Sequence, residues 1–371
     1  MNQELAKTAG ASAEIIVTAH AEFLDSALQE LKHIEKQLRA LETLAPGIAH
    51  CSVPDAPKFM HSVAEARPTF VRHIAPVQAA MQLENTEADL AKLALCLAEL
   101  PTFAMLERGQ HFAVQTRMVQ SEEGGSKRAY SGGRINQLLA GAIVEETGAV
   151  EDMRRPQIVI SLLCTHEKAY MGISLARDNL SLWPGGMRHF AQTEEQISRA
   201  EFKLLEALEV FGVTLPTRGR ALDLGAAPGG WTRLLLEAGL KVVAVDPAKL
   251  DPRLFRRPGL VHFRGYTEHY LEVEEPGKKP QRFDVIMNDM RMDARDAARL
   301  LIQMRDRLQQ DGFIISTLKL PHATASIDPL KNLREATSLL SRHFDIVQAK
   351  QLFHNRQEVT VIAARPRSQQ L

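Results

Sequence analysis

Residues 221–232, ALDLGAAPGGWT, join a short apolar run to a turn of small residues and then to a helical pattern. Gly225, Gly229 and Gly230 would let the backbone approach a ligand closely, and free N–H groups at a helix start favour an electron-rich group. Two ligands fit: a dinucleotide, or an adenosine-bearing cofactor without a pyrophosphate. The spacing G-x-x-x-G-G differs from the dinucleotide fingerprint G-x-G-x-x-G, and Pro228 removes an N–H that a pyrophosphate would use. The turn therefore predicts an adenosine-bearing cofactor.

Three charged side chains stand where later apolar runs end. Asp246 closes the run VVAVD, 21 residues after Gly225, and a carboxylate there can accept hydrogen bonds from both hydroxyls of a ribose. Asp289 closes the run IMND, and Lys319 closes STLK. A lysine at the rim of a buried sheet is costly unless it is paired. We therefore expect Asp289 and Lys319 to pair across adjacent strand ends.

The C-terminal half has the alternation of strands and helices that would position these groups. We expect strands at 221–224, 240–245, 260–263, 283–288, 312–318, 344–350 and 358–364, and helices at 199–211, 232–238, 294–309 and 329–341. Short apolar strands alternating with helices predict an α/β fold with a mostly parallel seven-stranded sheet covered on both faces. Ligands of such sheets bind beyond the carboxyl ends of the strands.

The N-terminal half predicts a smaller α+β region. We expect helices at 22–43, 54–66, 86–100 and 135–146, and strands at 14–19, 47–53, 70–74, 111–119, 157–164 and 169–174. Thr86 with Asp89 three residues later is similar to a capping box at a helix start. Residues 177–190 are expected to be an irregular linker.

Composition limits the function classes. The number of Lys and Arg residues equals the number of Asp and Glu residues, so the chain has no overall positive charge that would indicate nucleic-acid binding. Residues 193–371 nevertheless hold 27 basic against 23 acidic side chains. Three scattered cysteines argue against a disulfide framework or a zinc site, and we expect no metal. The N-terminus lacks signal-peptide features and no apolar run is long enough to span a membrane, so a cytoplasmic protein is expected.

Four motifs, in this order, carry a resemblance: LDLGAAPGGWT (222–232), NDM (288–290), TLKLP (317–321) and HNRQEVTV (354–361). Together they resemble the FtsJ (RrmJ) type of ribose 2'-O-methyltransferases, and SRAEFKL (198–204) with a WPGG linker extends the likeness to the RlmM subfamily. The resemblance implies a Rossmann-like class I methyltransferase domain over 198–371. It also implies a ferredoxin-like domain over 1–84, a THUMP-like RNA-binding domain over 85–182 and a linker over 183–197.

The family's catalytic set of lysine, aspartate, lysine and glutamate has a match at each position. The resemblance implies these catalytic residues: Lys203, Asp289, Lys319 and Glu358. With the glycine turn, it implies these contacts to S-adenosyl-L-methionine: Ser198, Asp223, Gly225, Ala227, Pro228, Gly229, Gly230, Trp231, Asp246 and Asp289. One position departs from the pattern, because Tyr266 stands where the subfamily has an aspartate near the adenine. Tyr266, Glu268 or the backbone could take over that contact.

The implied reaction transfers a methyl group to a ribose 2'-hydroxyl of RNA, in 23S ribosomal RNA or a precursor particle. A ribose hydroxyl is a poor nucleophile, so a base must take its proton, and we expect Lys319 to do so as a neutral amine. Two alternatives stay open: a methyltransferase with a non-RNA substrate, and a catalytically silent RNA-binding or ribosome-assembly module. Candidate phosphate contacts are Arg253, Arg256, Arg257, Lys127, Arg128 and Arg134. Aromatic residues make up only 5% of the chain, which argues against base stacking as the main mode of RNA recognition.

Overall fold

The computed structural model describes residues 12–119, 128–273, 280–322 and 328–367. The chain divides into two compact units, Met1–Arg188 and His189–Leu371, which we call the N-terminal and C-terminal units. Their boundary falls inside the linker expected at 183–197. Within the described ranges, no helix is long and apolar enough to cross a membrane.

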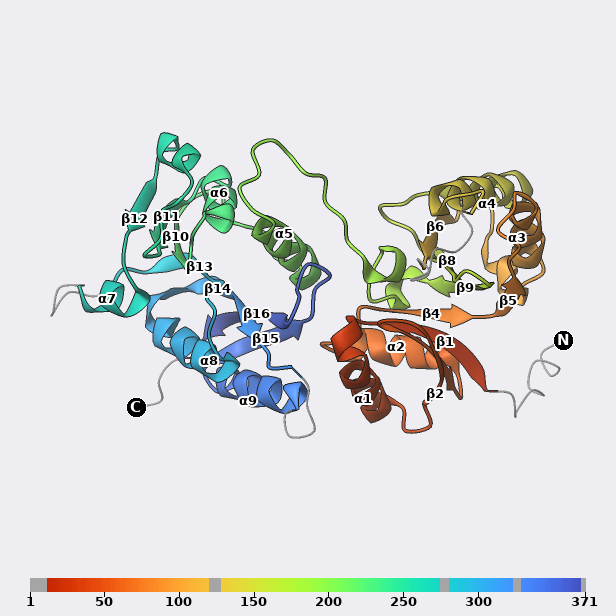
Figure 1. Ribbon diagram of the computed structural model, residues 1–371, viewed down its shortest axis with the longest axis horizontal. Helices are drawn as coiled ribbons and strands as arrows, with labels where there is room; N and C mark the ends of the chain where they lie inside the picture. Colours follow the sequence, from red (N-terminus) through yellow and green to blue (C-terminus); the bar gives the residue numbers. More distant parts are fainter. Residues whose placement is uncertain (1–11, 120–127, 274–279, 323–327, 368–371) are drawn as a thin grey trace. The chain divides into compact units, whose positions relative to one another are not determined.

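The C-terminal unit is built on one seven-stranded sheet with the order β12-β11-β10-β13-β14-β16-β15 (Figure 1). Its strands are β10 Arg220–Leu224, β11 Lys241–Val245, β12 Leu260–Phe263, β13 Phe283–Asn288, β14 Leu308–Lys319, β15 Phe344–Lys350 and β16 Glu358–Pro366. Neighbouring strands run parallel from β12 to β14, whereas β16 is antiparallel to both β14 and β15. The mostly parallel seven-stranded sheet, and with it the α/β Rossmann-like fold class, is confirmed.

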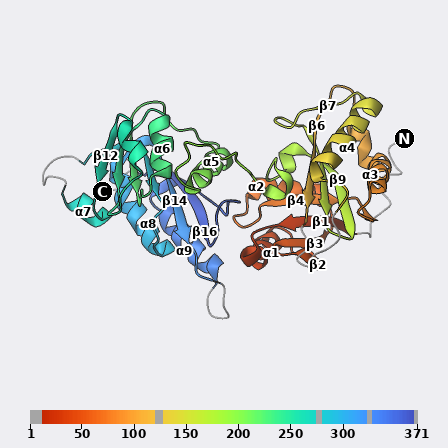
Figure 2. The same cartoon turned by 45° about the horizontal axis from the view of Figure 1, so that its top comes forward.

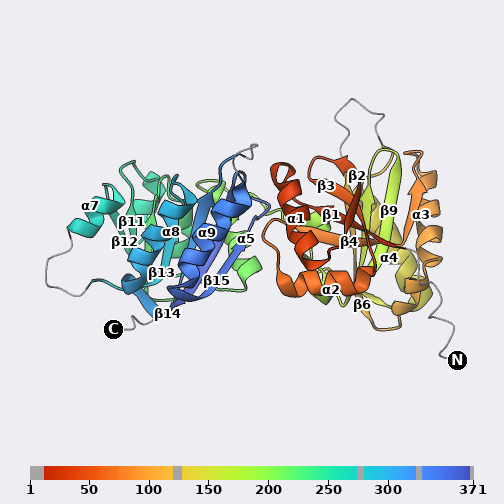
Figure 3. The ribbon, with the colours of Figure 1, turned by 90° about the horizontal axis from the view of Figure 1, so that it is seen from below.

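Helices cover both faces of this sheet. They are α5 Ala200–Phe211, α6 Gly230–Glu237, α7 Thr267–Glu272, α8 Ala294–Gln303 and α9 Pro329–Ser341. Leu204 of α5 and Leu235 of α6 pack with Val285 and Met287 of β13 in one core cluster. The pair α8 and α9 lies on the opposite face (Figure 3). Successive residues of a strand point to opposite faces, so the middle of a strand covered on both sides must be apolar, as Val285, Ile286 and Met287 of β13 are.

The first sheet of the N-terminal unit has the order β2-β3-β1-β4, and every pairing is antiparallel (Figure 2). Its elements are β1 Ala13–Thr18, α1 Leu24–Ile34, β2 Arg39–Ala45, β3 Ile48–Val53, α2 Ala56–Ala66 and β4 His73–Val77. This βαββαβ succession is the ferredoxin-like motif. The expected α+β ferredoxin-like region is therefore present.

The second sheet of the N-terminal unit has the order β5-β9-β8-β6-β7. Its elements are β5 Ala79–Gln82, α3 Ala88–Ala98, β6 His111–Met118, α4 Gly132–Thr147, β7 Val150–Glu151, β8 Ile158–Cys164 and β9 Lys168–Leu175. Leu93 of α3 and Ile135 of α4 pack with Phe112 and Ile160 of the sheet in one core.

Two predicted helices are too long. The helix expected over 22–43 ends at Ile34, and β2 follows as an edge strand paired with β3. The helix expected over 294–309 ends at Gln303, and β14 begins at Leu308. In both places apolar residues at helical spacing continue past the helix end, and strand pairing, which local periodicity does not encode, decides the outcome.

The expected capping box at Thr86 does not form. Helix α3 has Glu87 at its N-cap without a side-chain cap bond. The Asp89 carboxylate instead accepts hydrogen bonds from the backbone N–H of Glu84 and Asn85 and from the hydroxyl of Tyr130. Asp89 is fully buried, and these three donors satisfy it inside the unit.

Candidate active site

The glycine turn lies between the end of β10 and the start of α6. Gly225 has φ +72°, and a Cβ there would come within 2.6 Å of Met290 Cγ. Gly229 has φ +113° and would bring a Cβ into the side chain of Leu254. Both conformations favour glycine, so the turn requires these residues for its own backbone path. Helix α6 begins at Gly230, which leaves its first N–H groups at this turn.

Two of the expected cofactor contacts have side chains that point into the protein. Asp223 is buried and accepts a hydrogen bond of 2.6 Å from the Thr232 hydroxyl, which ties β10 to α6. Burial raises the pKa of Asp223 to about 7, and the bond from Thr232 acts in the opposite direction. The Trp231 indole N–H donates to the carbonyl oxygen of Ala200 at 2.6 Å, and its ring lies in the core. The side chains of Asp223 and Trp231 therefore support the glycine turn from the side of the protein interior.

Asp246 lies beside the turn, directly after β11. Its Oδ2 accepts from the backbone N–H of Ala227 at 3.0 Å, and its Oδ1 accepts from that of Ala248 at 2.7 Å. Each carboxylate oxygen has two lone pairs, so both keep capacity for a further donor. Ser198 Oγ is buried without a hydrogen-bond partner among the described residues, and a Cβ at Gly230 would collide with it. An unsatisfied hydroxyl against a glycine helix start is the kind of site that a polar ligand completes.

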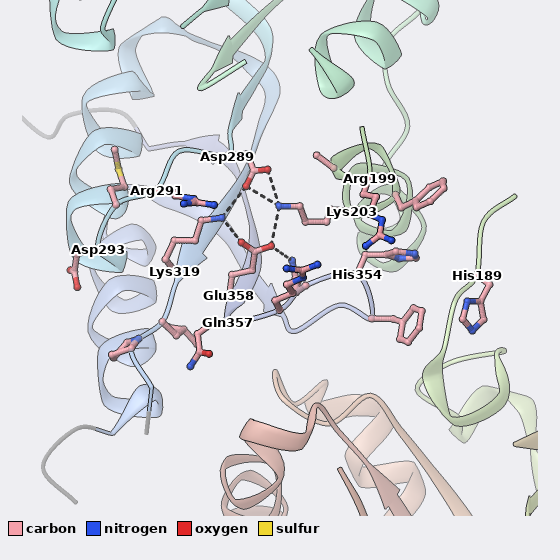
Figure 4. A pocket seen from close by; sticks show the side chains of 18 residues that line it. His189, Arg199, Lys203, Asp289, Arg291, Asp293, Lys319, His354, Gln357 and Glu358 are labelled. Atoms are coloured by element: carbon pink, nitrogen blue, oxygen red, sulfur yellow. Dashed lines mark hydrogen bonds and ion pairs between the residues drawn. The ribbon is translucent and has the colours of Figure 1, made fainter. Parts of the chain in front are cut away.

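The four residues expected to be catalytic form a closed ring of alternating charges (Figure 4). Lys203 Nζ lies 2.8 Å from Asp289 Oδ2 and 3.0 Å from Glu358 Oε1. Lys319 Nζ lies 3.1 Å from Asp289 Oδ1 and also contacts Glu358 Oε2. Each lysine therefore contacts both carboxylates. The predicted pairing of Asp289 with Lys319 is confirmed, and the structure adds Lys203 and Glu358 to it.

Four different elements place this lysine–carboxylate ring. Lys203 comes from α5, and Asp289 follows β13 directly, with its N–H donating to the carbonyl oxygen of Leu224 at 3.2 Å. Lys319 ends β14 and Glu358 begins β16, and the two are direct partners in the antiparallel ladder. The ring therefore lies at the carboxyl ends of the parallel strands, one strand away from the glycine turn.

The ring is only partly open to solvent, and the pKa values of Lys203 and Asp289 are shifted by the charges beside them. Burial by itself would lower the pKa of Lys203, but Asp289 and Glu358 outweigh it and raise that pKa. Burial by itself would raise the pKa of Asp289, but the ammonium groups of Lys203 and Lys319 outweigh it and hold that pKa below its usual value.

Two comparisons with protein families agree with this geometry. Residues 196–356 match the FtsJ-like methyltransferase family, and residues 86–174 match the THUMP domain. The chain carries an FtsJ-like methyltransferase domain. A THUMP domain precedes it, and the resemblance drawn from the motifs is confirmed.

Curated relatives carry one name. A protein called "Ribosomal RNA large subunit methyltransferase M" from Halorhodospira halophila is 35% identical over 187 residues, which cover 49% of this chain and 51% of that protein. The protein of that name from Laribacter hongkongensis is 34% identical and covers 50% of this chain and 52% of its own. The one from Pseudomonas entomophila is 26% identical over 84% of each chain. The alignment thus spans about half the length of the first two relatives.

The lysine–carboxylate ring of the FtsJ-like domain opens into a cavity of about 1140 Å³. Arg199, Arg291 and Arg356 line it, together with aromatic side chains (Figure 4). All three arginines are exposed, and in the part of the chain that the structure describes none of them has an acidic partner. The cavity therefore joins the lysine–carboxylate ring to unneutralised positive charge.

Two further polar residues hold the ring, and the sequence analysis did not assign them. The Thr317 hydroxyl donates to Asp289 Oδ1 at 2.7 Å, and Lys319 Nζ donates to Thr317 Oγ1 at 3.1 Å. The Asn355 amide donates to Glu358 Oε1 at 3.2 Å. Thr317 belongs to the motif TLKLP and Asn355 to HNRQEVTV, so motif membership was the signal that could have found them.

Three of the six expected phosphate contacts have other partners. The Arg128 guanidinium donates to the Asn85 side chain and to the carbonyl oxygens of Val119 and Cys164. Arg253 pairs with Asp251, and Arg257 pairs with Glu195. Lys127 lies outside the described residues. The arginines of the cavity are better candidates for phosphate contacts than these.

The structure is compatible with each of the alternatives for the contact near the adenine, which are Tyr266, Glu268 and the backbone. Tyr266 precedes α7 and is 70% exposed, and Glu268 in the first turn of α7 is exposed as well. Among the residues that the structure describes, neither side chain has a hydrogen-bond or ion-pair partner that would commit it elsewhere. For metals, no group of three or more His, Cys, Asp or Glu side chains suited to an ion occurs within the described ranges.

Proposed function

We propose that this protein transfers a methyl group from S-adenosylmethionine to a ribose 2'-hydroxyl of RNA, with large-subunit ribosomal RNA as substrate and Lys319 as general base. The lysine–carboxylate ring beside the glycine turn carries the proposal. The FtsJ-like and THUMP matches support it, as does the shared name of the curated relatives.

The residues around the glycine turn fit the cofactor. Asp246 offers carboxylate capacity to a ribose and Ser198 Oγ offers a buried hydroxyl. Gly225 and Gly230 let the backbone of the turn lie closely against Met290 and Ser198. Ala227, Pro228 and Gly229 lie between these two glycines in the turn. When bound, S-adenosylmethionine supplies a methyl group already activated by the positive charge on sulfur.

In this proposal, Lys319 takes the proton of the ribose hydroxyl. In that step the O–H bond breaks and an N–H bond forms on Nζ, so Lys319 must enter the step as a neutral amine. Its side chain is 26% exposed, against 14% for Lys203, which makes it the lysine from which a proton reaches water more readily. Asp289 and Glu358 hold Nζ in place, and Lys203 balances their charge. Fixing the reacting groups in this way supplies much of the rate.

The test is methyl transfer from tritiated S-adenosylmethionine to RNA by the full chain. Large-subunit ribosomal RNA, stripped of protein, and precursor particles are offered separately. The RNA is then digested with alkali, which cleaves next to a free 2'-hydroxyl and spares a methylated one. Label in alkali-resistant dinucleotides is the expected result. Label in mononucleotides or in protein would contradict ribose methylation, and no label in any fraction would favour the catalytically silent module.

A further inference from the structure

Five aromatic rings gather at one side of the cavity. His189 and Phe353 meet edge to face with ring centroids 4.8 Å apart, and Phe190 stacks on Phe202 at 5.7 Å. His354 lies within 5.5 Å of the rings of Phe190, Phe202 and Phe353. We call these five residues the aromatic wall.

The aromatic wall is not part of the hydrophobic core. Four of its members line the cavity: His189, Phe202, Phe353 and His354. His189 is exposed and the others are half-buried, whereas phenylalanines of the core such as Phe283 and Phe344 are fully buried. The chain has only 14 phenylalanines, and three of them meet here. Rings held at a cavity surface offer flat faces to a ligand.

A buried carboxylate fixes two of these rings. Glu206, 4% exposed, accepts from the backbone N–H of Phe353 at 2.7 Å and of His354 at 3.0 Å. The same carboxylate also bonds His354 Nδ1 at 2.7 Å. A buried carboxylate is destabilising unless its oxygens accept hydrogen bonds, and the oxygens of Glu206 accept them from residues 353 and 354. These bonds hold the two residues in place. The rings are thus set in place before a ligand arrives.

The aromatic wall shares its elements with the lysine–carboxylate ring. Phe202 directly precedes Lys203 on α5, and the segment that carries His354 leads through Asn355 to Glu358 (Figure 4). The cavity is also lined by the unpaired Arg199, Arg291 and Arg356 described above. A ligand that lies against the rings therefore reaches both the reactive centre and positive charge.

We infer that the aromatic wall binds an unstacked base of single-stranded RNA, either that of the methylated nucleotide or that of its neighbour. Bases of unpaired RNA stack on Phe and His side chains, and phosphates on the same strand pair with arginine. The ribose is then presented to Lys319 because its base is clamped at one side. This inference rests on the proposed function for the identity of the reacting group.

Two RNA strands of equal length and charge test the inference by binding alone. One is a short fluorescein-labelled oligocytidylate, and the other is the same strand with its central positions abasic. Fluorescence anisotropy measures both Kd values for the full-length parent and for the double variant F202L/F353L, which keeps apolar bulk but removes two rings. F255L is the matched control, since Phe255 is 58% exposed in the same unit and does not line the cavity.

We expect the parent and F255L to bind the base-bearing strand about 10-fold more tightly than the abasic strand, as loss of base–aromatic stacking predicts. F202L/F353L should lose this preference. Arg356→Ala should weaken both strands equally and keep it. Equal binding of the two strands by the parent, a preference that persists in F202L/F353L, or no binding of the oligocytidylate would each overturn the inference.

The methyl-transfer assay separates this result from the proposed function. A strand preference that depends on the two rings, in a protein that labels no RNA, keeps the aromatic wall and rejects the reaction. Alkali-resistant label with no strand preference keeps the reaction and rejects the wall as a base site.

Discussion

Lys319 and Glu358 are direct cross-strand partners at the end of the antiparallel β14–β16 ladder. Residues opposite each other in such a pair project to the same face of the sheet, so their side chains meet. A slip of one residue would send Glu358 to the other face and break the lysine–carboxylate ring. The reversed direction of β16 is therefore what brings a strand's first residue to the edge where the parallel strands end.

Lys319→Met removes the proposed base while keeping an unbranched side chain of similar length. Methyl transfer to RNA should fall by about 10²- to 10⁴-fold, the range in which positioned proton transfer contributes. S-adenosylhomocysteine should bind as it does to the parent, as measured by calorimetry. Lys331→Met, at an exposed position on α9, is the control and should keep full activity. Parent-level methylation by the Lys319 variant would reject the assigned role.

Asp289→Asn tests the electrostatics of the ring through the pH dependence of stability. Because the native pKa of Asp289 lies below its ordinary value of 3.8, its ionised form stabilises the fold above that value. This contribution is lost as pH falls through the lower native pKa, since the unfolded chain then binds more protons. Urea unfolding on acidification should therefore show a shallower loss of free energy in Asp289→Asn than in the parent. Asp296→Asn, exposed on α8, should keep the parent's slope.

Gly225→Ala tests whether the turn requires glycine for space as well as for backbone angle. Gly212 has φ +64° with open space around its Cβ position, so Gly212→Ala measures left-handed strain alone. Gly225 has a similar φ but would crowd Met290, and repacking of that kind costs about 1–3 kcal/mol more. Thermal unfolding should show the larger loss of Tm for Gly225→Ala. Equal losses of Tm in the two variants would show that the Met290 side chain can move aside without a loss of stability.

Asp246→Asn should weaken cofactor binding by about 10-fold or more, because hydrogen bonds to a charged group contribute about 1.5–3 kcal/mol. The amide has one acceptor oxygen, whereas the backbone N–H groups of Ala227 and Ala248 use both carboxylate oxygens. Calorimetric titration with S-adenosylhomocysteine gives the affinity. Asp306→Asn, 66% exposed beside Arg305, controls for loss of one negative charge. An unchanged Kd would exclude Asp246 as a ribose contact.

The aromatic wall shows how a chain of low aromatic content can still gather several rings at one place. An aromatic content of 5% argues against stacking only if the rings are spread evenly over the chain. The fold instead brings His189 and Phe202 beside Phe353 and His354, from segments about 150 residues apart in sequence. No local pattern reports such a meeting.

The sequence alone determined the parts of this protein that depend on short-range physics. Apolar runs that fit a buried strand, glycines that permit positive φ, and charged residues directly after strands are local properties. They identified the α/β sheet, the turn at Gly225 and the pair of Asp289 with Lys319. Where local signals conflicted with pairing, as between α1 and β2, periodicity extended the helix too far.

Only the tertiary structure decided which distant side chains meet. Lys203 and Glu358 are separated by 155 positions, and their contact at 3.0 Å depends on the packing of α5 and on β16 entering between β14 and β15. Among the described residues, the same packing leaves Arg291 and Arg356 without carboxylate partners at the cavity, whereas Arg253 pairs with Asp251 and Arg257 with Glu195. The hydrophobic periodicity of a helix or strand indicates which of its faces is buried. Which other element packs against that face depends on the whole chain.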